Sequence, residues 1–156
     1  MPRWRHIDDI RARNIRHLVV QEPVVISPDL GIDGVLAASV RDPRTRHIYV
    51  VAPDGTLLGA IRMNVLVEYL FPLVALATDS PELAALPART ADDLMNPEPR
   101  FVEESTTLGE LAAIFMEEKI NELPVVDGNR RVVGQVSMHE VISRFLRATS
   151  PSDEEG

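Results

Sequence analysis

Few side chains in this sequence could do chemistry, and the best spaced of them lie near its C-terminus. Ser137 and Glu140 stand three residues apart in Ser-Met-His-Glu. This is the capping-box pattern, in which the hydroxyl bonds forward and the carboxylate reaches back at a helix start. The same two groups could also bond a polar ligand, and the two roles are compatible. His47 and His139 lack a second ligand at helical metal-site spacing, so both are expected to be partly exposed structural residues.

No arrangement of residues indicates catalysis. The sequence has no glycine-rich phosphate loop before a helix, no nucleophile elbow and no His-Glu-x-x-His motif. The acidic pairs at 103–104 and 117–118 favour solvated surface, with a weak divalent-cation site as the alternative. We therefore expect a protein that is not an enzyme, with no catalytic residue, no metal site and no obligatory cofactor.

Composition narrows the class further. The chain has 156 residues, 45% hydrophobic and 26% charged, which is enough to bury a core. It has no cysteine, which excludes disulfides and fits a reducing compartment. The net charge of −8 argues against a nucleic-acid polymer as partner. No apolar run approaches the roughly 20 residues that span a bilayer, and no signal-peptide core opens the chain. These features predict a cytoplasmic protein without membrane insertion.

Comparison of the chain with itself reveals two copies of one unit. Residues 22–26 align with residues 98–102, about 76 positions later, and residues 48–51 align with 123–126 at nearly the same offset. Gly59 then falls on Gly134. Chance would hardly supply all these matches in the same order, so the chain is a tandem repeat.

The hydrophobic pattern of each copy predicts the order β-α-β-β-α. In the first copy the strands are expected at 24–26, 48–51 and 57–61, with a closing helix near 65–70. In the second they are expected at 101–102, 123–126 and 132–136, with a closing helix near 140–146. The helix between the first two strands should present an apolar stripe to the core, formed by Ile32, Val35, Leu36, Ser39 and Val40 in one copy and Leu108, Leu111, Ala112, Phe115 and Met116 in the other.

Turn and cap residues support this order. Asp54-Gly55 and Asp127-Gly128 separate the paired strands, and a glycine there accepts the positive φ of a hairpin turn. Thr107 is predicted to cap the helix that follows it. A single copy has too small a core to be comfortable alone, so two copies are expected to press sheet to sheet. The fold class is therefore α/β (α+β). Repeat 1 covers 10–71, a helical linker with a short helix around 81–86 covers 72–90, repeat 2 covers 91–147, and 1–9 and 148–156 are terminal extensions.

Several of these segments resemble one family. Leu-Pro-Val-Val-Asp at 123–127 and Gly-Gln-Val-Ser-Met-His-Glu at 134–140 look like the closing half of a cystathionine-β-synthase (CBS) domain, and residues 91–97 are similar to its opening. The resemblance covers about residues 10–147 and is weaker in the first copy, where Tyr49 stands in place of the usual proline. The segment Ile-Tyr-Val-Val at 48–51 is more similar to the CBS pairs of bacterial magnesium transporters.

The resemblance implies two CBS repeats packed through their sheets with pseudo-two-fold symmetry and two equivalent clefts. Such pairs commonly form dimers, bind adenosine-containing ligands such as AMP, ATP or S-adenosylmethionine, and control a partner protein. The family's nucleotide pattern is a glycine, two apolar positions, Ser or Thr, two variable positions and Asp. Gly134 and Ser137 match it, and Glu140 replaces the aspartate. The expected ligand-binding residues of the second cleft are Ser137, Glu140, Gly134, Leu123, Pro124, Phe101, Val102 and Asn121.

The first copy departs from the pattern. Arg62 takes the hydroxyl position, and Val65 takes the carboxylate position, so a normal nucleoside is not expected there. Arg46, His47 and Arg62 are instead candidates for binding a phosphate or another anion. In the second copy Glu122 would repel a phosphate, which makes a triphosphate a poorer ligand than adenosine, AMP or S-adenosylmethionine.

Two hypotheses follow. In the first, the chain is a dimeric regulatory module that senses an adenosyl ligand through the second-repeat cleft and controls a partner protein. In the second, it is a ligand-free or divalent-cation-responsive interaction module that regulates a transporter or an enzyme. The sequence leaves open the regulated partner and the orientation of the homodimer.

Overall fold

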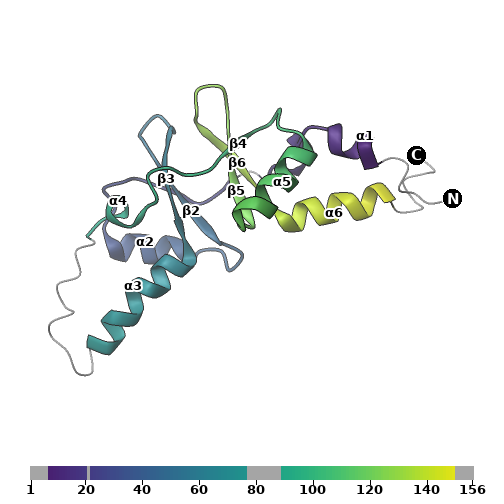
Figure 1. Cartoon of the computed structure of the whole chain (residues 1–156). Helices are drawn as coiled ribbons and strands as arrows, with labels where there is room; N and C mark the ends of the chain where they lie inside the picture. Colours follow the sequence, from purple (N-terminus) through teal and green to yellow (C-terminus); the bar gives the residue numbers. More distant parts are fainter. Residues whose placement is uncertain (1–6, 21, 77–88, 150–156) are drawn as a thin grey trace. The chain divides into compact units, whose positions relative to one another are not determined.

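The computed structural model describes residues 7–20, 22–76 and 89–149, which form two compact units (Figure 1). One unit consists of residues 23–99, and the other combines residues 1–22 with 100–156. Each unit has a three-stranded sheet with helices packed against it (Figure 1). The expected mixture of strands and helices, two small sheets in one chain, is confirmed.

The elements follow the predicted order in both copies. The unit of residues 23–99 contains β1 (Val25–Ile26), α2 (Ile32–Ser39), β2 (His47–Val51), β3 (Leu57–Arg62), α3 (Met63–Leu76) and α4 (Ala91–Leu94). The other unit contains α1 (Ile7–Ala12), the 3₁₀ turn η2 (Arg16–Leu18), β4 (Val102–Glu103), α5 (Leu108–Glu118), β5 (Glu122–Val126), β6 (Val132–Ser137) and α6 (Met138–Thr149).

The two sheets repeat each other in topology and register. In one, β1 pairs parallel with β2, and β2 pairs antiparallel with β3; β4, β5 and β6 do the same in the other. The register shifts at Val50/Val51 in one hairpin and at Val125/Val126 in the other. Two sequence-similar halves therefore fold alike, down to the same irregularity.

The segment that leads into each repeat packs in the unit of the other repeat. The N–H of Ile15 donates to the Thr106 carbonyl at 2.9 Å, and the N–H of Ala91 donates to the Leu30 carbonyl at the same distance. Ile15 and Ala91 are equivalent by the repeat, and both are fully buried. The sequence repeats at 10–71 and 91–147 are consequently not the compact units: residues 10–22 lie with the second repeat and residues 91–99 with the first.

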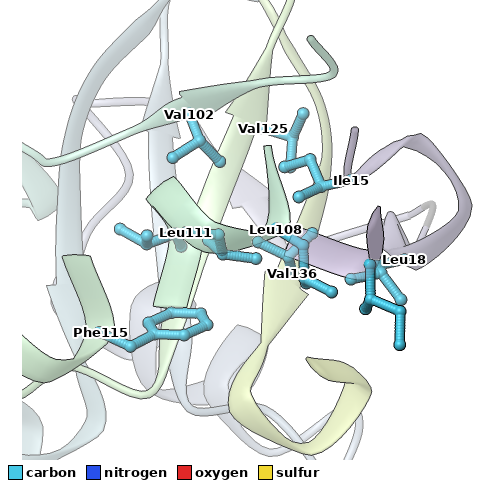
Figure 2. Packing of buried hydrophobic residues seen from close by; sticks show 10 residues of the cluster. Ile15, Leu18, Val102, Leu108, Leu111, Phe115, Val125 and Val136 are labelled. Carbon is cyan, nitrogen blue, oxygen red and sulfur yellow. The ribbon is translucent and has the colours of Figure 1, made fainter. Parts of the chain in front are cut away.

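Each unit has its own hydrophobic core on one face of its sheet. Figure 2 shows Leu111 and Phe115 of α5 close to Val136 of β6, with Ile15 and Leu18 of the lead-in nearby. The core of the other unit is made of Ile26, Val35, Ala38, Ile48, Val50, Ile61, Leu66 and Ala91. β2 and β5 are the middle strands of their sheets, and their residues are buried almost without interruption, as strands covered on both faces require.

The predicted helical stripes are right except at their last residue. Val35 and Ser39 of α2 are buried, as are Leu111 and Phe115 of α5, but Val40 and Met116 are exposed to solvent. The expectation that these two residues face the core is wrong. A residue eight positions along an α-helix lies about 80° from the first, because each residue turns the helix by about 100°.

The glycine prediction is right in one hairpin and wrong in the other. Gly55 has φ 93°, but in the second hairpin the positive φ of 64° belongs to Arg130 and not to Gly128. Arg130 donates its N–H to the Asp127 carbonyl, as Gly55 does to that of Ala52. Arg130 is thus the true equivalent of Gly55, and the Asp-Gly pairs do not align in space.

The closing helix of the first repeat is longer than expected. α3 continues through Pro72 to Leu76, although proline removes one backbone hydrogen bond from the helix. The helix expected around residues 81–86 lies outside the described residues. In the lead-in of the second repeat, the Asp93 carboxylate accepts the N–H groups of Arg89 at 2.8 Å and Thr90 at 3.2 Å. These bonds hold the pKa of Asp93 below its usual value.

The cap of α5 gives a test of local stability. Thr107 accepts the N–H of Glu110 at 3.2 Å, and the Glu110 carboxylate accepts the N–H of Thr107 at 3.1 Å, so both halves of the capping box form. We expect Thr107→Ala to lower the free energy of unfolding by about 1 kcal/mol. Thr107→Ser, which keeps the hydroxyl, is the control in urea denaturation. Equal losses in both variants would contradict a capping role.

Candidate functional site

The expected ligand residues of the second repeat meet where β6 passes into α6. Ser137 ends β6, lies opposite Glu122 of β5 and is followed directly by α6. The N–H of Met138 donates to the Asn121 carbonyl at 2.9 Å, which ties the start of α6 to the start of β5. The structure therefore brings Asn121, Ser137 and Glu140 together at one end of this sheet.

At the start of α6 only one of the two hydrogen bonds of a capping box forms. The Ser137 hydroxyl accepts the N–H of Glu140 at 3.3 Å, as the serine of a capping box should. Among the residues that the structure describes, however, the Glu140 carboxylate makes no returning bond. Glu110 of α5 shows the contrast, since its carboxylate is engaged by Thr107. The carboxylate of Glu140 is half-buried and remains available for another donor.

Pleating of the strands divides the other expected residues between two faces of the sheet. Leu123 and Val102 belong to the hydrophobic core of the unit. Pro124 lies between Leu123 and Val125 in β5, opposite Gln135 of β6, so it shares the other face with Ser137. Gln135 is the residue on this face that the family pattern did not single out. Strand alternation was the signal that could have identified it.

Phe101 lies beside the hairpin turn. The Arg130 guanidinium stands 4.9 Å from the centre of its ring, within the range of a cation–π contact. A depression of about 440 Å³ beside it is lined by Phe101, Val102, Glu103, Ser105, Thr106 and Glu110. Phe101 and Val102 therefore border this depression, which Ser137 and Glu140 do not line.

Gly134 has no room for a side chain, because another segment of the chain lies against it. A Cβ on this residue would lie 2.3 Å from a Val19 methyl carbon and 2.8 Å from the Val20 carbonyl oxygen. Val20 and Gln135 exchange backbone hydrogen bonds of 2.8 and 3.0 Å beside it. The space beside this glycine is thus filled by the lead-in segment. Gly59 has the same role, because its Cβ would lie 2.8 Å from the Asn96 carbonyl oxygen.

The basic residues of the first repeat meet at the equivalent junction. His47 lies opposite Arg62 across β2 and β3, and the N–H of Met63 donates to the Arg46 carbonyl at 3.1 Å. His47 is only 9% exposed, more buried than expected, and its ring is stacked 6.4 Å from that of Tyr49. The Arg46 guanidinium bonds the carbonyls of Pro43 and Thr45. Arg46 and Arg62 are exposed.

Two kinds of feature are absent from the described part of the chain. No group of three or more His, Asp or Glu side chains in that part is placed to hold a metal ion. None of its helices combines the length and the hydropathy that a membrane crossing requires.

Known proteins share both the sequence of the second repeat and the fold of the whole. The CBS domain family matches residues 91–147. The crystal structure of CBSX2 in complex with AMP superposes with a TM-score of 0.73, over 88% of this chain and 98% of that one, at 23% identity. Residues 91–147 are thus a CBS domain, and the chain has the fold of a CBS pair. The CBS pair of protein MJ0100, in complex with 5′-methylthioadenosine and S-adenosyl-L-methionine, superposes with a TM-score of 0.69 over 89% of this chain and 99% of that one, at 20% identity.

The relatives found by sequence are longer proteins, and this chain matches only part of each. CBSX1, a chloroplastic CBS domain-containing protein of Arabidopsis thaliana, is 39% identical over 61 residues, which are 39% of this chain and 26% of CBSX1. A homoserine O-acetyltransferase of Methanocorpusculum labreanum is 28% identical over 118 residues, 73% of this chain and 21% of that enzyme. This CBS pair thus spans a fifth to a quarter of the length of these two relatives.

Proposed function

We propose that this CBS pair is a regulatory module that binds an adenosyl ligand through its second repeat and thereby controls a partner protein. The observation that carries the proposal is the carboxylate of Glu140, which has no bond from the described residues, although the backbone N–H of Glu140 is capped by the Ser137 hydroxyl at the start of α6. A carboxylate accepts both hydroxyl protons of a ribose, and a serine hydroxyl bonds ribose or phosphate.

The two solved relatives support the ligand class. One is a complex with AMP, and the other is a complex with 5′-methylthioadenosine and S-adenosyl-L-methionine. Both ligands contain an adenosyl group, so adenosine-containing molecules are the first to test here. A signal would arise from different affinity of the ligand for two arrangements of the protein.

Charge at the site favours a ligand with few phosphates. Glu122 is buried at the position opposite Ser137. A carboxylate about 5 Å from a phosphate costs roughly 3 kcal/mol at an effective dielectric of 20. We therefore expect adenosine, AMP or S-adenosylmethionine to bind more tightly than ATP. In the first repeat, Arg46, His47 and Arg62 are proposed to take an anion and not a nucleoside.

Calorimetric titration with adenosine, AMP, S-adenosylmethionine and ATP tests the proposal. We expect saturable heat from at least one of the first three ligands and a weaker response to ATP. If the folded protein gives no heat with any of the four, the proposal is rejected.

Variants of the two polar residues locate the site. We expect Glu140→Gln to weaken binding of the adenosyl ligand by about 10- to 100-fold, because hydrogen bonds to a charged group contribute about 1.5–3 kcal/mol. Ser137→Ala should weaken it as well, with a loss of about 1 kcal/mol in stability from the cap. Glu103→Gln, in the neighbouring depression, is the matched control. A loss of binding in Glu103→Gln alone would place the ligand in that depression.

A second candidate is a ligand-free or divalent-cation-responsive interaction module that regulates a transporter or an enzyme. It is favoured by the first repeat, in which Arg62 and Val65 replace the hydroxyl and the carboxylate of the family pattern. A rise in melting temperature with magnesium but with none of the four adenosine-containing ligands would support it. In both versions the module has no catalytic residue and no obligatory cofactor, and it acts in the cytoplasm.

A further inference from the structure

Basic side chains gather where the N-terminal lead-in meets α6, within one compact unit. η2 packs against α6, and Leu18 of η2 shares a core cluster with Val141 of α6. Residues three apart are neighbours on the surface of a helix, so positions 144 and 147 continue from Val141 along α6. We define the basic strip as Arg16 and His17 of η2 with Arg144 and Arg147 of α6.

The basic strip carries charge that the rest of the unit leaves largely unmatched. Arg16, His17 and Arg147 are exposed, and Arg144 is half-buried. Arg16 pairs with Glu104 at 3.1 Å. Within the described residues, the side chains of the other three have neither an ion pair nor a hydrogen bond. A positive surface is therefore present on a chain whose net charge is −8.

The shared fold does not need these four basic residues. Their equivalents in the first repeat and its lead-in are acidic or neutral, namely Asp92, Asp93, Tyr69 and Pro72. The two sheets nevertheless have the same topology and register. Since one copy forms with acids in the place of Arg16 and His17, the basic strip is a feature of the second unit alone and points to a role other than folding.

We propose that the basic strip is a docking surface for a short acidic segment of a partner protein. The planar guanidinium group of an arginine binds a carboxylate through two parallel hydrogen bonds, and the strip contains three arginines. Complementary charge also speeds the encounter with a partner and fixes its orientation. Docking at the strip requires no adenosyl ligand, so its test is separate from the test of the ligand site.

A long polyanion fits the basic strip less well than a short acidic segment. Proteins that bind DNA tightly contact about six to ten phosphates, whereas the strip has four basic side chains, one of which is already paired with Glu104. The net charge of −8 also repels an extended polyanion wherever it leaves the strip. A segment of a few carboxylates contacts the strip alone and largely avoids this repulsion.

Fluorescence anisotropy with a labelled peptide of eight glutamates tests the proposal. We expect saturable binding at about 50 mM salt and a Kd at least about tenfold higher at about 0.5 M salt, because exposed charges are screened. A labelled peptide of eight serines should not bind. Absence of saturable binding at millimolar concentrations of the glutamate peptide would overturn the proposal. Tighter binding of a labelled single-stranded DNA octamer would also overturn it and assign the strip to nucleic acid.

Charge reversal locates the bound peptide. Arg144→Glu/Arg147→Glu should raise the Kd about 30-fold or more, and Arg147→Glu alone, at an exposed position, about threefold or more, because attraction is replaced by repulsion. Arg41→Glu/Arg131→Glu is the matched control, since it changes the net charge equally at two exposed positions outside the strip. We expect its Kd to stay within about threefold of the wild type. Equal losses in the two double variants, with folding checked by circular dichroism, would contradict docking at the strip.

Discussion

Gly134→Ala is expected to lower the free energy of unfolding by about 3 kcal/mol, a cost typical of an added methyl group that cannot be accommodated. The new methyl would overlap Val19 and the backbone oxygen of Val20, at 2.3 and 2.8 Å. The valine methyl can rotate, but the carbonyl oxygen belongs to the segment that bonds Gln135, so the lead-in itself must move away. Urea denaturation followed by circular dichroism measures the loss.

Gly128→Ala is the matched control for this prediction. Gly128 lies in the turn of the same hairpin, and a Cβ there would meet no atom within 4 Å. We expect its stability to remain within about 0.5 kcal/mol of the wild type. If both variants were equally stable, the lead-in would not be held against β6 as described.

Ile15→Ala should destabilise the unit that contains the second repeat, although Ile15 belongs to the first repeat in the sequence. Its side chain is fully buried in the core with Leu108 and Val136, and truncation of a buried isoleucine to alanine costs about 2–5 kcal/mol. Hydrogen exchange followed by mass spectrometry should show faster exchange in residues 102–137.

The control for Ile15→Ala is Arg16→Ala. Arg16 is exposed and pairs with Glu104 at 3.1 Å, and an exposed ion pair contributes less than about 1 kcal/mol. We expect its exchange pattern to match the wild type. Faster exchange confined to residues 25–62 in Ile15→Ala would contradict the exchange of lead-in segments.

Local sequence signals predicted the elements well because each rests on short-range physics. The short apolar runs of β2 and β5 and the helical stripe of α5 predicted the order β-α-β-β-α, and Thr107 caps α5 as predicted. Val40 and Met116 were misplaced because the eighth residue after the start of such a stripe has turned about 80° away from it. Gly128 was misassigned because both hairpin loops contain Asp-Gly, but the positive φ falls at Arg130, further along the second loop.

The exchange of lead-in segments could not be predicted from the repeat. Residues 15–18 and 91–94 align with each other, so the two segments are expected to have equivalent surroundings. The alignment does not show whether each segment packs against its own repeat or against the other one. The decisive contacts are backbone hydrogen bonds from Ile15 to Thr106 and from Ala91 to Leu30, which leave little trace in the sequence. Gly59 and Gly134 are the sequence features that reflect this exchange, because a lead-in segment passes too close to each of them for a side chain.

The structure brings the polar residues of the candidate site together and separates its apolar ones. Ser137 and Glu140 meet at one helix start, as their spacing requires, and Asn121 joins them through the pairing of β5 with β6. Leu123 and Val102 instead fill the core, and Gln135 lies on the face of the sheet that Ser137 shares. Successive residues of a strand point to opposite faces of the sheet, and this decides which side chains lie in the core. The family pattern gives only the positions of residues and not their faces.

Binding of an adenosyl ligand at the start of α6 is the central claim, and NMR titrations of ¹⁵N-labelled protein with adenosine, AMP and S-adenosylmethionine test it most directly. We predict that at least one of the three causes saturable shifts of the amide signals of Asn121 and of residues 137–140. Shifts confined to residues 46–63 or to residues 101–110, or unchanged spectra at millimolar concentrations of all three, would contradict it.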